Sequence, residues 1–376
     1  MKVLMGFSGG VDSAVGTYLL KEEGHDVDGA FMRNWDALAN SDYLGNPTVN
    51  DPQCPQEKDY QDAKKAAERL GVKLLRVDFV KEYWDSVFSY FLSEYKHGRT
   101  PNPDVFCNKY IKFDSFLKFA LDNGYEKIAM GHYAGKTQTE DGHVHIIKAK
   151  DRNKDQSYFL CFLSEKQVDS CLFPLSEITK PEVREIAHRL DLETVMDKKD
   201  STGVCFIGER NFRQFLTNYF PATPGDIVEG KTGKVVGRHM GVLYYTIGQH
   251  KGLGIGGVSG EEEGKFFIYR KDVEHNTLYV AHPSERYLLT STSCTLSNVN
   301  LTTPRFALAK RVGVKFRYRQ TDQEAYLSLT EDGARLDYPQ GVESVTPGQI
   351  AAIYDGDVCL GGGIIEKIYR GDERID

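Results

Sequence analysis

Two cysteines stand in sequence contexts that could favour a reactive thiolate. Cys107 leads from a proline-punctuated stretch into a predicted helix, whose N-terminal dipole would favour the thiolate, and Asp104 lies three residues before it. Cys205 lies in a glycine-bounded segment that follows Lys198 and Lys199, whose charges would favour a thiolate in the same way. Because the thiolate is the nucleophilic form of cysteine, both positions are candidates for sulfur chemistry, although either thiol taken alone could equally be inert.

A glycine turn near the N-terminus, Gly6–Ser13, has the composition of a phosphate-binding loop. Its sequence is Gly-Phe-Ser-Gly-Gly-Val-Asp-Ser, and it lies between a predicted strand and a predicted helix. Free backbone N–H groups and the positive end of the helix dipole would point at one spot, which favours a phosphate. The loop is not a Walker A motif and lacks the G-x-G-x-x-G pattern of dinucleotide folds. A turn that merely connects two elements is the less favoured alternative, because the flanking elements and paired serines agree with a binding loop.

The other five cysteines carry weaker signals. Four lie in apolar or alternating runs, where an unpaired cysteine usually packs as a small core residue: Cys161, Cys171, Cys294 and Cys359. Cys54 lies in a polar loop and could be reactive or merely exposed. No Cys/His spacing is typical of a metal site, and the scattered cysteines indicate no disulfide framework.

Alternating strand and helix patterns in the first half must position these residues. Apolar runs predict strands at 3–7, 27–32, 72–79 and 127–130, and helical spacing predicts helices at 11–24, 59–71, 84–95 and after 107. Repeated β-α-β units indicate a parallel sheet covered on both faces. The polar stretch 34–58, which contains three prolines, predicts a mobile loop.

The later part of the chain changes to strand patterns. A Thr179-x-x-Glu182 capping box predicts a helix that ends near residue 190. Beyond it, residues 266–269 and 278–280 predict paired strands, and 350–354 and 358–360 flank an Asp-Gly hairpin turn. We expect this region to form a small β-domain, with a barrel as its architecture.

Composition limits the class of protein. A chain of 376 residues with 40% hydrophobic and 27% charged residues is long enough for two or three packed domains and is not a disordered tail. No apolar run reaches the ~20 residues of a membrane helix, and no signal peptide pattern follows Met1, so we expect a cytoplasmic protein without a membrane partner. The net charge of −7 argues against a uniformly basic protein that coats nucleic acid, but not against a local basic face.

Two local clusters of basic residues could contact phosphates. Four cations alternate with apolar residues along 309–320 and so predict one basic strand face: Arg311, Lys315, Arg317 and Arg319. A second cluster lies within 148–154: Lys148, Lys150, Arg152 and Lys154. A merely solvated surface is the alternative for any one of these side chains.

Several motifs together resemble those of the tRNA-specific 2-thiouridylases, a family of PP-loop ATP pyrophosphatases that replace O2 of the wobble uridine of tRNA by sulfur. The motifs lie at 6–13, 100–108, 131–133, 154–160 and 200–208, and the resemblance continues through 248–257, 317–322 and 359–363. It covers essentially the whole chain. The resemblance implies an α/β chain with a PP-loop catalytic domain at 1–209, a small central domain at 210–280 and a tRNA-contacting C-terminal β-barrel at 281–376.

The resemblance also implies a mechanism. ATP would adenylate O2 of uridine 34 and release pyrophosphate, after which persulfide sulfur would displace AMP. Cys205 would accept that sulfur from a cysteine desulfurase or a sulfur-relay protein, with Cys107 as partner thiol and Asp104 as general acid/base. A transient Cys107–Cys205 disulfide would form and be opened by an external reductant.

Binding residues follow from the same resemblance. ATP, with its Mg²⁺, would contact the following residues: Gly6, Phe7, Ser8, Gly9, Gly10, Val11, Asp12, Ser13, Met32 and Gly131. The tRNA, with its target base splayed out of the stack, would contact another set: Asn102, Pro103, Asp104, His132, Lys154, Asp155, Gln156, Arg317, Tyr318 and Gln349.

Two other functions stay open at the level of sequence. One is a PP-loop enzyme that adenylates a substrate for attack by nitrogen, such as an amidotransferase synthetase or a lysidine-type tRNA synthetase, which needs no paired thiols. The other is a non-catalytic RNA-binding or thiol-sensing protein that has kept a nucleotide site.

Overall fold

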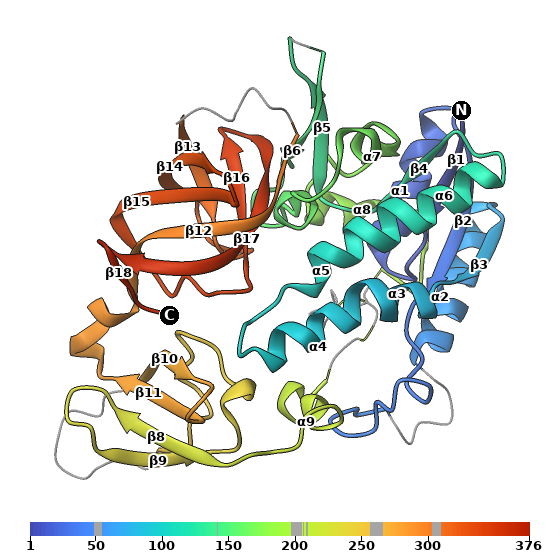
Figure 1. The fold of residues 1–376 in the computed structure, drawn as a ribbon. Helices are drawn as coiled ribbons and strands as arrows, with labels where there is room; N and C mark the ends of the chain where they lie inside the picture. Colours follow the sequence, from blue (N-terminus) through green and yellow to red (C-terminus); the bar gives the residue numbers. More distant parts are fainter. Residues whose placement is uncertain are drawn as a thin grey trace.

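The computed structural model describes residues 1–48, 55–140, 142–196, 205, 207, 210–255, 266–302 and 310–376. Along the chain, an N-terminal α/β unit is followed by a four-stranded central sheet and a C-terminal barrel (Figure 1). Within the described ranges, no helix is long and apolar enough to cross a membrane. Cys54 and most of the predicted segment 200–208 lie outside the described residues.

The N-terminal unit is built on five parallel strands in the order β3-β2-β1-β4-β7. Their bounds are β1 (Lys2–Gly6), β2 (Asp26–Arg33), β3 (Leu74–Asp78), β4 (Lys127–Ala129) and β7 (Cys171–Leu172). The chain crosses from one side of β1 to the other between β3 and β4, so the carboxyl ends of β1 and β4 border a topological switch point. Ligands of open α/β sheets bind at such points.

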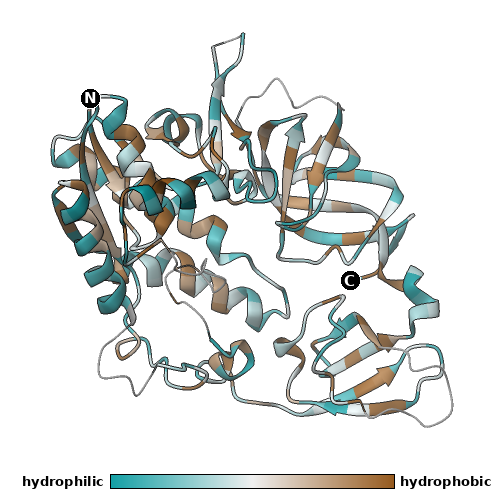
Figure 2. Cartoon of the chain, turned by 180° about the vertical axis from the view of Figure 1, so that it is seen from behind, coloured by the Kyte–Doolittle hydropathy of each residue, from teal (hydrophilic) through white to brown (hydrophobic). Residues whose placement is uncertain are grey.

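Helices cover both faces of this sheet, as predicted. Val3 and Met5 of β1 pack with α1 (Val11–Glu22), α2 (Pro55–Leu70) and α8 (Lys180–Arg189). Leu4 faces the opposite layer, because successive strand side chains alternate. That layer contains α3 (Val80–Tyr83), α4 (Ser89–Lys96), α5 (Pro103–Phe106) and α6 (Phe116–Asp122), together with the π-helical turns η1 (Trp84–Phe88) and η2 (Cys107–Ser115). Figure 2 shows the hydrophobic colour concentrated in the sheet strands and in the sides of helices that face them.

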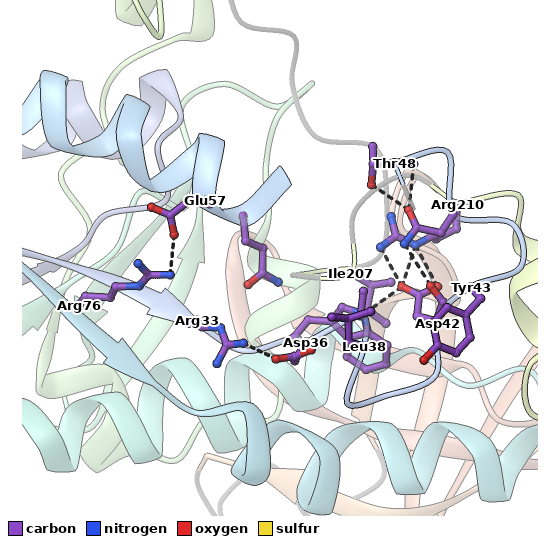
Figure 3. Close-up of a pocket in the computed structure, with 14 residues that line it drawn as sticks. Arg33, Asp36, Leu38, Asp42, Tyr43, Thr48, Glu57, Arg76, Ile207 and Arg210 are labelled. Carbon is purple, nitrogen blue, oxygen red and sulfur yellow. Dashed lines mark hydrogen bonds and ion pairs between the residues drawn. The ribbon is translucent and has the colours of Figure 1, made fainter. Parts of the chain in front are cut away.

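The polar stretch after β2 is anchored by buried polar contacts. Trp35 donates its indole N–H to Asp42 at 3.0 Å, and Arg210 pairs with the same carboxylate at 2.8 Å. These side chains line a cavity of about 420 Å³, in which Arg76 pairs with Glu57 at 2.9 Å (Figure 3). Helix α2 begins at Pro55, inside the stretch for which the sequence predicts only a loop.

A hairpin connects the N-terminal unit to the barrel. Strand β5 (Ala134–Gln138) pairs with β6 (Val144–Lys148), and β6 pairs in turn with β17 (Val358–Arg370) of the barrel. Figure 1 shows this hairpin between the two units. The short helices η3 (Ser157–Leu160) and α7 (Glu165–Asp169) follow it. The barrel is therefore joined to the N-terminal unit by backbone hydrogen bonds.

The central unit follows α9 (Phe212–Thr217) and η4 (Val242–Tyr244) lies within it. Its sheet has the order β10-β11-β8-β9, with bounds β8 (Gly225–Glu229), β9 (Val235–His239), β10 (Phe267–Asp272) and β11 (Thr277–Ala281). The antiparallel pairing of β10 with β11 confirms the predicted pair of strands.

Six strands close the C-terminal barrel, because β12 pairs with both β15 and β17. After η5 (Pro283–Leu289), its strands are β12 (Thr290–Leu301), β13 (Lys310–Lys315), β14 (Gln323–Thr330), β15 (Gly333–Glu343), β16 (Ile350–Asp355) and β17, to which β18 (Glu373–Arg374) is added. The predicted hairpin turn at Gly356 is confirmed, with φ of +59°. The barrel predicted from the strand patterns is also confirmed.

Candidate active site

The glycine turn leaves the carboxyl end of β1 and opens α1. Gly9 has φ of +72°, and a Cβ there would lie 2.4 Å from the carbonyl oxygen of Asp59, so only glycine fits. The Ser13 hydroxyl donates to the carbonyl of Gly10 at 3.0 Å and accepts the Ser8 N–H at 3.2 Å. Gly10 occupies the N-cap of α1 and offers no side chain to the first N–H groups of that helix, which are thus available to an anion.

A cavity of about 380 Å³ lies over this turn, at the switch point between β1 and β4. It is lined by all ten residues that the family resemblance assigns to ATP: Gly6, Phe7, Ser8, Gly9, Gly10, Val11, Asp12, Ser13, Met32 and Gly131. A Cβ at Gly131 would lie 3.1 Å from the backbone nitrogen of Ser13, so the segment that follows β4 packs closely against the first turn of α1. Cys205 and Lys112 line the same cavity. The glycine turn and one of the two candidate cysteines therefore line one cavity.

Asp12 is held by two partners across the cavity. The ammonium group of Lys180 lies 2.7 and 2.9 Å from its carboxylate oxygens, and the Tyr133 hydroxyl donates to it at 2.8 Å. Lys180 is buried and begins α8, whose predicted capping box is confirmed by the Thr179 N–H donating to Glu182 at 2.6 Å. Among the described residues, no group of three or more His, Cys, Asp or Glu could hold a metal ion by itself.

The candidate catalytic residues meet at the side of the cavity. Cys107 donates its S–H to the Cys205 sulfur, with 3.7 Å between the two Sγ atoms. The backbone N–H of Cys205 donates to Asp104 at 2.9 Å, and the Tyr83 hydroxyl donates to the Cys205 carbonyl at 3.0 Å. The two thiols, 98 positions apart in the sequence, are thus in contact in the folded chain.

The pKa values of the two thiols are shifted in opposite directions, and the difference corrects one prediction. The helix that carries Cys107 begins at Pro103, so Cys107 lies in its second turn and burial raises the pKa of this thiol well above its usual value. The expected dipole-favoured thiolate at Cys107 is therefore wrong. The pKa of Cys205 is lowered, first by the hydrogen bond from Cys107 and then, against the cost of burial, by the charge of Lys112. Lys198 and Lys199 lie outside the described residues.

Burial also alters two other groups of this site. The pKa of Asp104 is raised by burial, so its carboxyl group keeps a proton to higher pH than an exposed aspartate. His132 lines the cavity, and burial lowers its pKa well below the usual value, which keeps the imidazole neutral. Asn102 is the N-cap residue of α5 and Pro103 its first residue, and Gln156 accepts the Tyr133 N–H at 3.0 Å beside the cavity.

The remaining residues that the resemblance assigns to tRNA join the units of the protein. Arg317 donates to the carbonyls of Ile247 and Ser344 at 3.1 and 2.9 Å, and Gln349 donates to the carbonyl of Thr100 at 2.8 Å. The buried Asp155 pairs with Lys315 at 3.3 Å. Tyr318 lies with its ring centroid 4.4 Å from that of Phe159, and its hydroxyl donates to the Lys154 carbonyl at 3.5 Å.

The predicted basic strand face is wrong in its geometry. Strand β13 ends at Lys315, and Arg311 pairs with Glu324, so the face is short and largely neutralised. The cations of the second cluster are also paired: Lys148 with Asp322 at 2.5 Å, Lys150 with Glu182 at 3.5 Å and Arg152 with Asp357 at 2.5 Å. The two clusters nevertheless meet, because Lys148, Arg152, Lys315 and Arg319 border one cavity of about 670 Å³.

Comparisons with known proteins agree with this layout. Family models match in series: a tRNA methyl transferase HUP domain at 1–209, a tRNA methyl transferase PRC-barrel domain at 213–282 and an aminomethyltransferase beta-barrel domain at 291–365. The chain is 49% identical to the tRNA-specific 2-thiouridylase MnmA of Mycoplasma mycoides, covering 98% of this chain and 99% of that one. It is 48% identical to the enzyme of the same name from Shewanella baltica, covering 98% and 97%. The chain belongs to the tRNA-specific 2-thiouridylase family.

Sequence reasoning missed three residues of this candidate site. The sequence assigns no role to three residues that contact the candidate catalytic or nucleotide-binding groups: Lys112, Lys180 and Tyr83. For Lys180, the capping box carried a usable signal, since it placed a lysine at the first turn of a helix. For Lys112 and Tyr83 the contacts depend on Cys205, which is distant along the chain.

Proposed function

We propose that this chain catalyses ATP-dependent 2-thiolation of the wobble uridine of tRNA, position 34, and yields 2-thiouridine, AMP and pyrophosphate. Membership of the tRNA-specific 2-thiouridylase family makes it a tRNA-uridine 2-sulfurtransferase. The observation that carries the proposed mechanism is that the glycine turn and Cys205 line one cavity, with the Cys107 sulfur 3.7 Å from that of Cys205. Paired thiols at an adenylating site favour sulfur transfer over attack by nitrogen.

The adenylation half uses the glycine turn. Backbone N–H groups at the start of α1 suit the phosphates of ATP, and the Gly6–Gly131 side of the cavity, next to Met32, suits its adenosine part. Asp12 would ligate the Mg²⁺ that accompanies the nucleotide and neutralises phosphate charge. Lys180, already on Asp12, would hold this carboxylate in place until then.

The sulfur half uses the two thiols. The Cys205 thiolate would attack the outer sulfur of a persulfide on a cysteine desulfurase or relay protein, and the donor cysteine would leave as a thiolate. Cys107 would then either attack Cys205 and liberate sulfide or resolve the enzyme after transfer to C2. Either route ends in a Cys107–Cys205 disulfide, which a two-electron reductant must open. Asp104, whose pKa is raised by burial, would serve as the acid/base beside Cys205.

The tRNA would lie across the junction of the three units. Asn102, Pro103, Asp104 and His132 are near the reaction cavity, and a second group lies toward the barrel: Lys154, Asp155, Gln156, Arg317, Tyr318 and Gln349. We place the catalytic domain at 1–209, the central domain at 210–280 and the tRNA-contacting barrel at 281–376. A cytoplasmic location suits a reaction that needs tRNA, ATP and a reductant.

One assay tests this function. Unmodified tRNA, ATP, Mg²⁺ and a persulfide donor are incubated with the enzyme, and the digested nucleosides are analysed by mass spectrometry. We expect replacement of oxygen by sulfur at the wobble uridine. Cys205→Ser is expected to reduce this product by about three orders of magnitude or more, as for loss of a nucleophile. Cys294→Ala, in the barrel core, is the matched control, and an undiminished rate in Cys205→Ser would contradict the proposed role.

A further inference from the structure

Lys112 lies in a π-helical segment, η2, that orients its side chain toward the candidate catalytic thiols. It follows Cys107 by five residues within η2, which spans Cys107–Ser115. In an α-helix of 3.6 residues per turn, two residues five apart point about 140° away from each other. A π-helix closes hydrogen bonds from i to i+5, so residues five apart lie one above the other. The local helix type therefore puts Lys112 and Cys107 on one face.

The Lys112 ammonium group reaches the reacting sulfur. It hydrogen-bonds to Cys205, and its side chain lines the cavity that also contains the glycine turn. Among the described residues, Lys112 is the cation whose charge acts on Cys205, and the same charge acts on Cys107, Asp104 and His132. The site thus has one positive charge facing several groups that can carry or lose a proton.

The burial of Lys112 requires a negative partner. Burial disfavours its ammonium form, yet its pKa is raised, because Cys205, Cys107 and Asp104 act on it in the opposite direction. A buried ammonium group is stable only when it is paired. Lys112 hydrogen-bonds to the Cys205 side chain, whereas Asp104 accepts the backbone N–H of Cys205, so the Cys205 sulfur is the hydrogen-bond partner of Lys112. This pairing is electrostatically suited to an ammonium–thiolate ion pair.

We propose that Lys112 is a positioning residue for sulfur transfer, which holds Cys205 as a thiolate ready to attack a donor persulfide. This rests on the proposed function only for the identity of the donor. In the step, the Cys205 lone pair forms a bond to the donor's outer sulfur and the donor's S–S bond breaks. The electron pair of that bond leaves with the donor cysteine as a thiolate. The persulfide proton stays on the transferred sulfur, Lys112 keeps its own proton, and no external oxidant is consumed.

The test measures Cys205 alone. In a Cys107→Ser background, whose hydroxyl retains a donor to Cys205, the rate of alkylation by iodoacetamide is followed against pH by peptide mass spectrometry. Lys112→Met is expected to shift the midpoint of reactivity upward by about one pH unit, which slows alkylation at neutral pH roughly tenfold. Lys112→Arg is expected to restore most of the reactivity at neutral pH. Lys109→Met, on the same π-helical turn but next to Tyr110 and Phe162, is the matched control and is expected to leave the profile unchanged.

An unshifted profile in Lys112→Met would overturn the proposal. Lys112→Gln provides a second uncharged variant, and the melting temperature of each variant identifies a folding defect. The assay contains no tRNA, ATP or donor protein, so its outcome is separate from that of the proposed function. A second readout uses glutathione persulfide as the probe: sulfur loading of Cys205 is expected to slow in the uncharged variants, and equal loading would also count against Lys112.

Discussion

Charged side chains have different partners in two cavities of the molecule. The reaction cavity lies over the glycine turn and is lined by Cys205, and the second cavity lies beside the barrel and is bordered by Lys148 and Arg152. In the first, Lys112 and Lys180 face Cys205 and Asp12, the groups that we assign to sulfur transfer and nucleotide binding. In the second, Lys148 and Arg152 are neutralised by aspartates of the barrel. In the first cavity the cations are paired with the groups to which we assign chemistry. In the second they are paired with carboxylates, which the phosphates of a tRNA bound as we propose would have to replace.

Removal of the charge of Asp12 should have the largest effect on the reaction cavity. We expect Asp12→Asn to lower tRNA-dependent pyrophosphate release by about 10²–10³-fold, because it removes the carboxylate that we propose as a ligand of the Mg²⁺ of the nucleotide. Asp26→Asn, at the exposed start of β2, is the control for a lost charge and should leave the rate unchanged. Undiminished pyrophosphate release in Asp12→Asn would refute the assignment of the loop.

A methyl group in the glycine turn tests whether the cavity is preassembled. We expect Gly9→Ala to lower the free energy of unfolding by about 1–3 kcal/mol and to weaken ATP binding, since the new Cβ meets the Asp59 carbonyl at 2.4 Å. Gly24→Ala is the matched control: its φ is +81°, but nothing lies within 4 Å, so it reports the cost of the backbone conformation alone. Equal losses in the two variants, measured by chemical denaturation, would show that the turn can relax.

Removal of a cation beside the barrel should have a smaller effect, on tRNA affinity and its salt dependence. Arg319→Ala should weaken tRNA binding several-fold and reduce the slope of log affinity against log salt by about one, as for loss of one phosphate contact. ATP affinity should stay the same. Lys118→Ala, on the exposed side of α6, is a control for a removed surface cation. An unchanged salt slope in Arg319→Ala would remove this arginine from the RNA-binding surface.

Removal of the carboxylate that pairs with Arg152 tests whether this arginine can bind an RNA phosphate instead. It has the smallest expected effect on tRNA affinity. Asp357→Asn frees Arg152 from its carboxylate, so tRNA affinity should rise by about two- to fivefold and depend more steeply on salt. A drop in affinity would indicate that the ion pair positions Arg152 for RNA. Fluorescence titration with labelled tRNA at several salt concentrations measures both outcomes.

Short sequence patterns correctly predicted the features of the fold that depend on neighbouring residues. The strand, glycine turn and helix at the N-terminus, the capping box at Thr179 and the hairpin at Gly356 are each encoded within a few residues, and all are present. The pairing of Cys107 with Cys205 came from family resemblance, and the structure gives its distance. The close approach of the segment after β4 to the glycine turn follows from the strand order, which helical and strand periodicity alone do not specify.

The missed features depend on contacts between distant segments. The environment of Cys107 was predicted wrongly, because the helix begins at Pro103 and the thiol is buried by neighbours from elsewhere in the chain. The basic residues near β13 looked free in sequence, but carboxylates on other elements neutralise several of them. The role of Lys112 could not be predicted because an α-helix would place it on a different face from Cys107, whereas the π-helical segment places both residues on one face.

In the proposed mechanism, activation of the base and delivery of sulfur meet at the Cys107–Cys205 pair. The most direct measurement is a single turnover with persulfide-loaded enzyme, ATP and tRNA in the absence of reductant, followed by peptide mapping of the thiols and quantification of 2-thiouridine. The account predicts one Cys107–Cys205 disulfide for each thiolated uridine. Thiolated tRNA formed while both thiols stay free would contradict it.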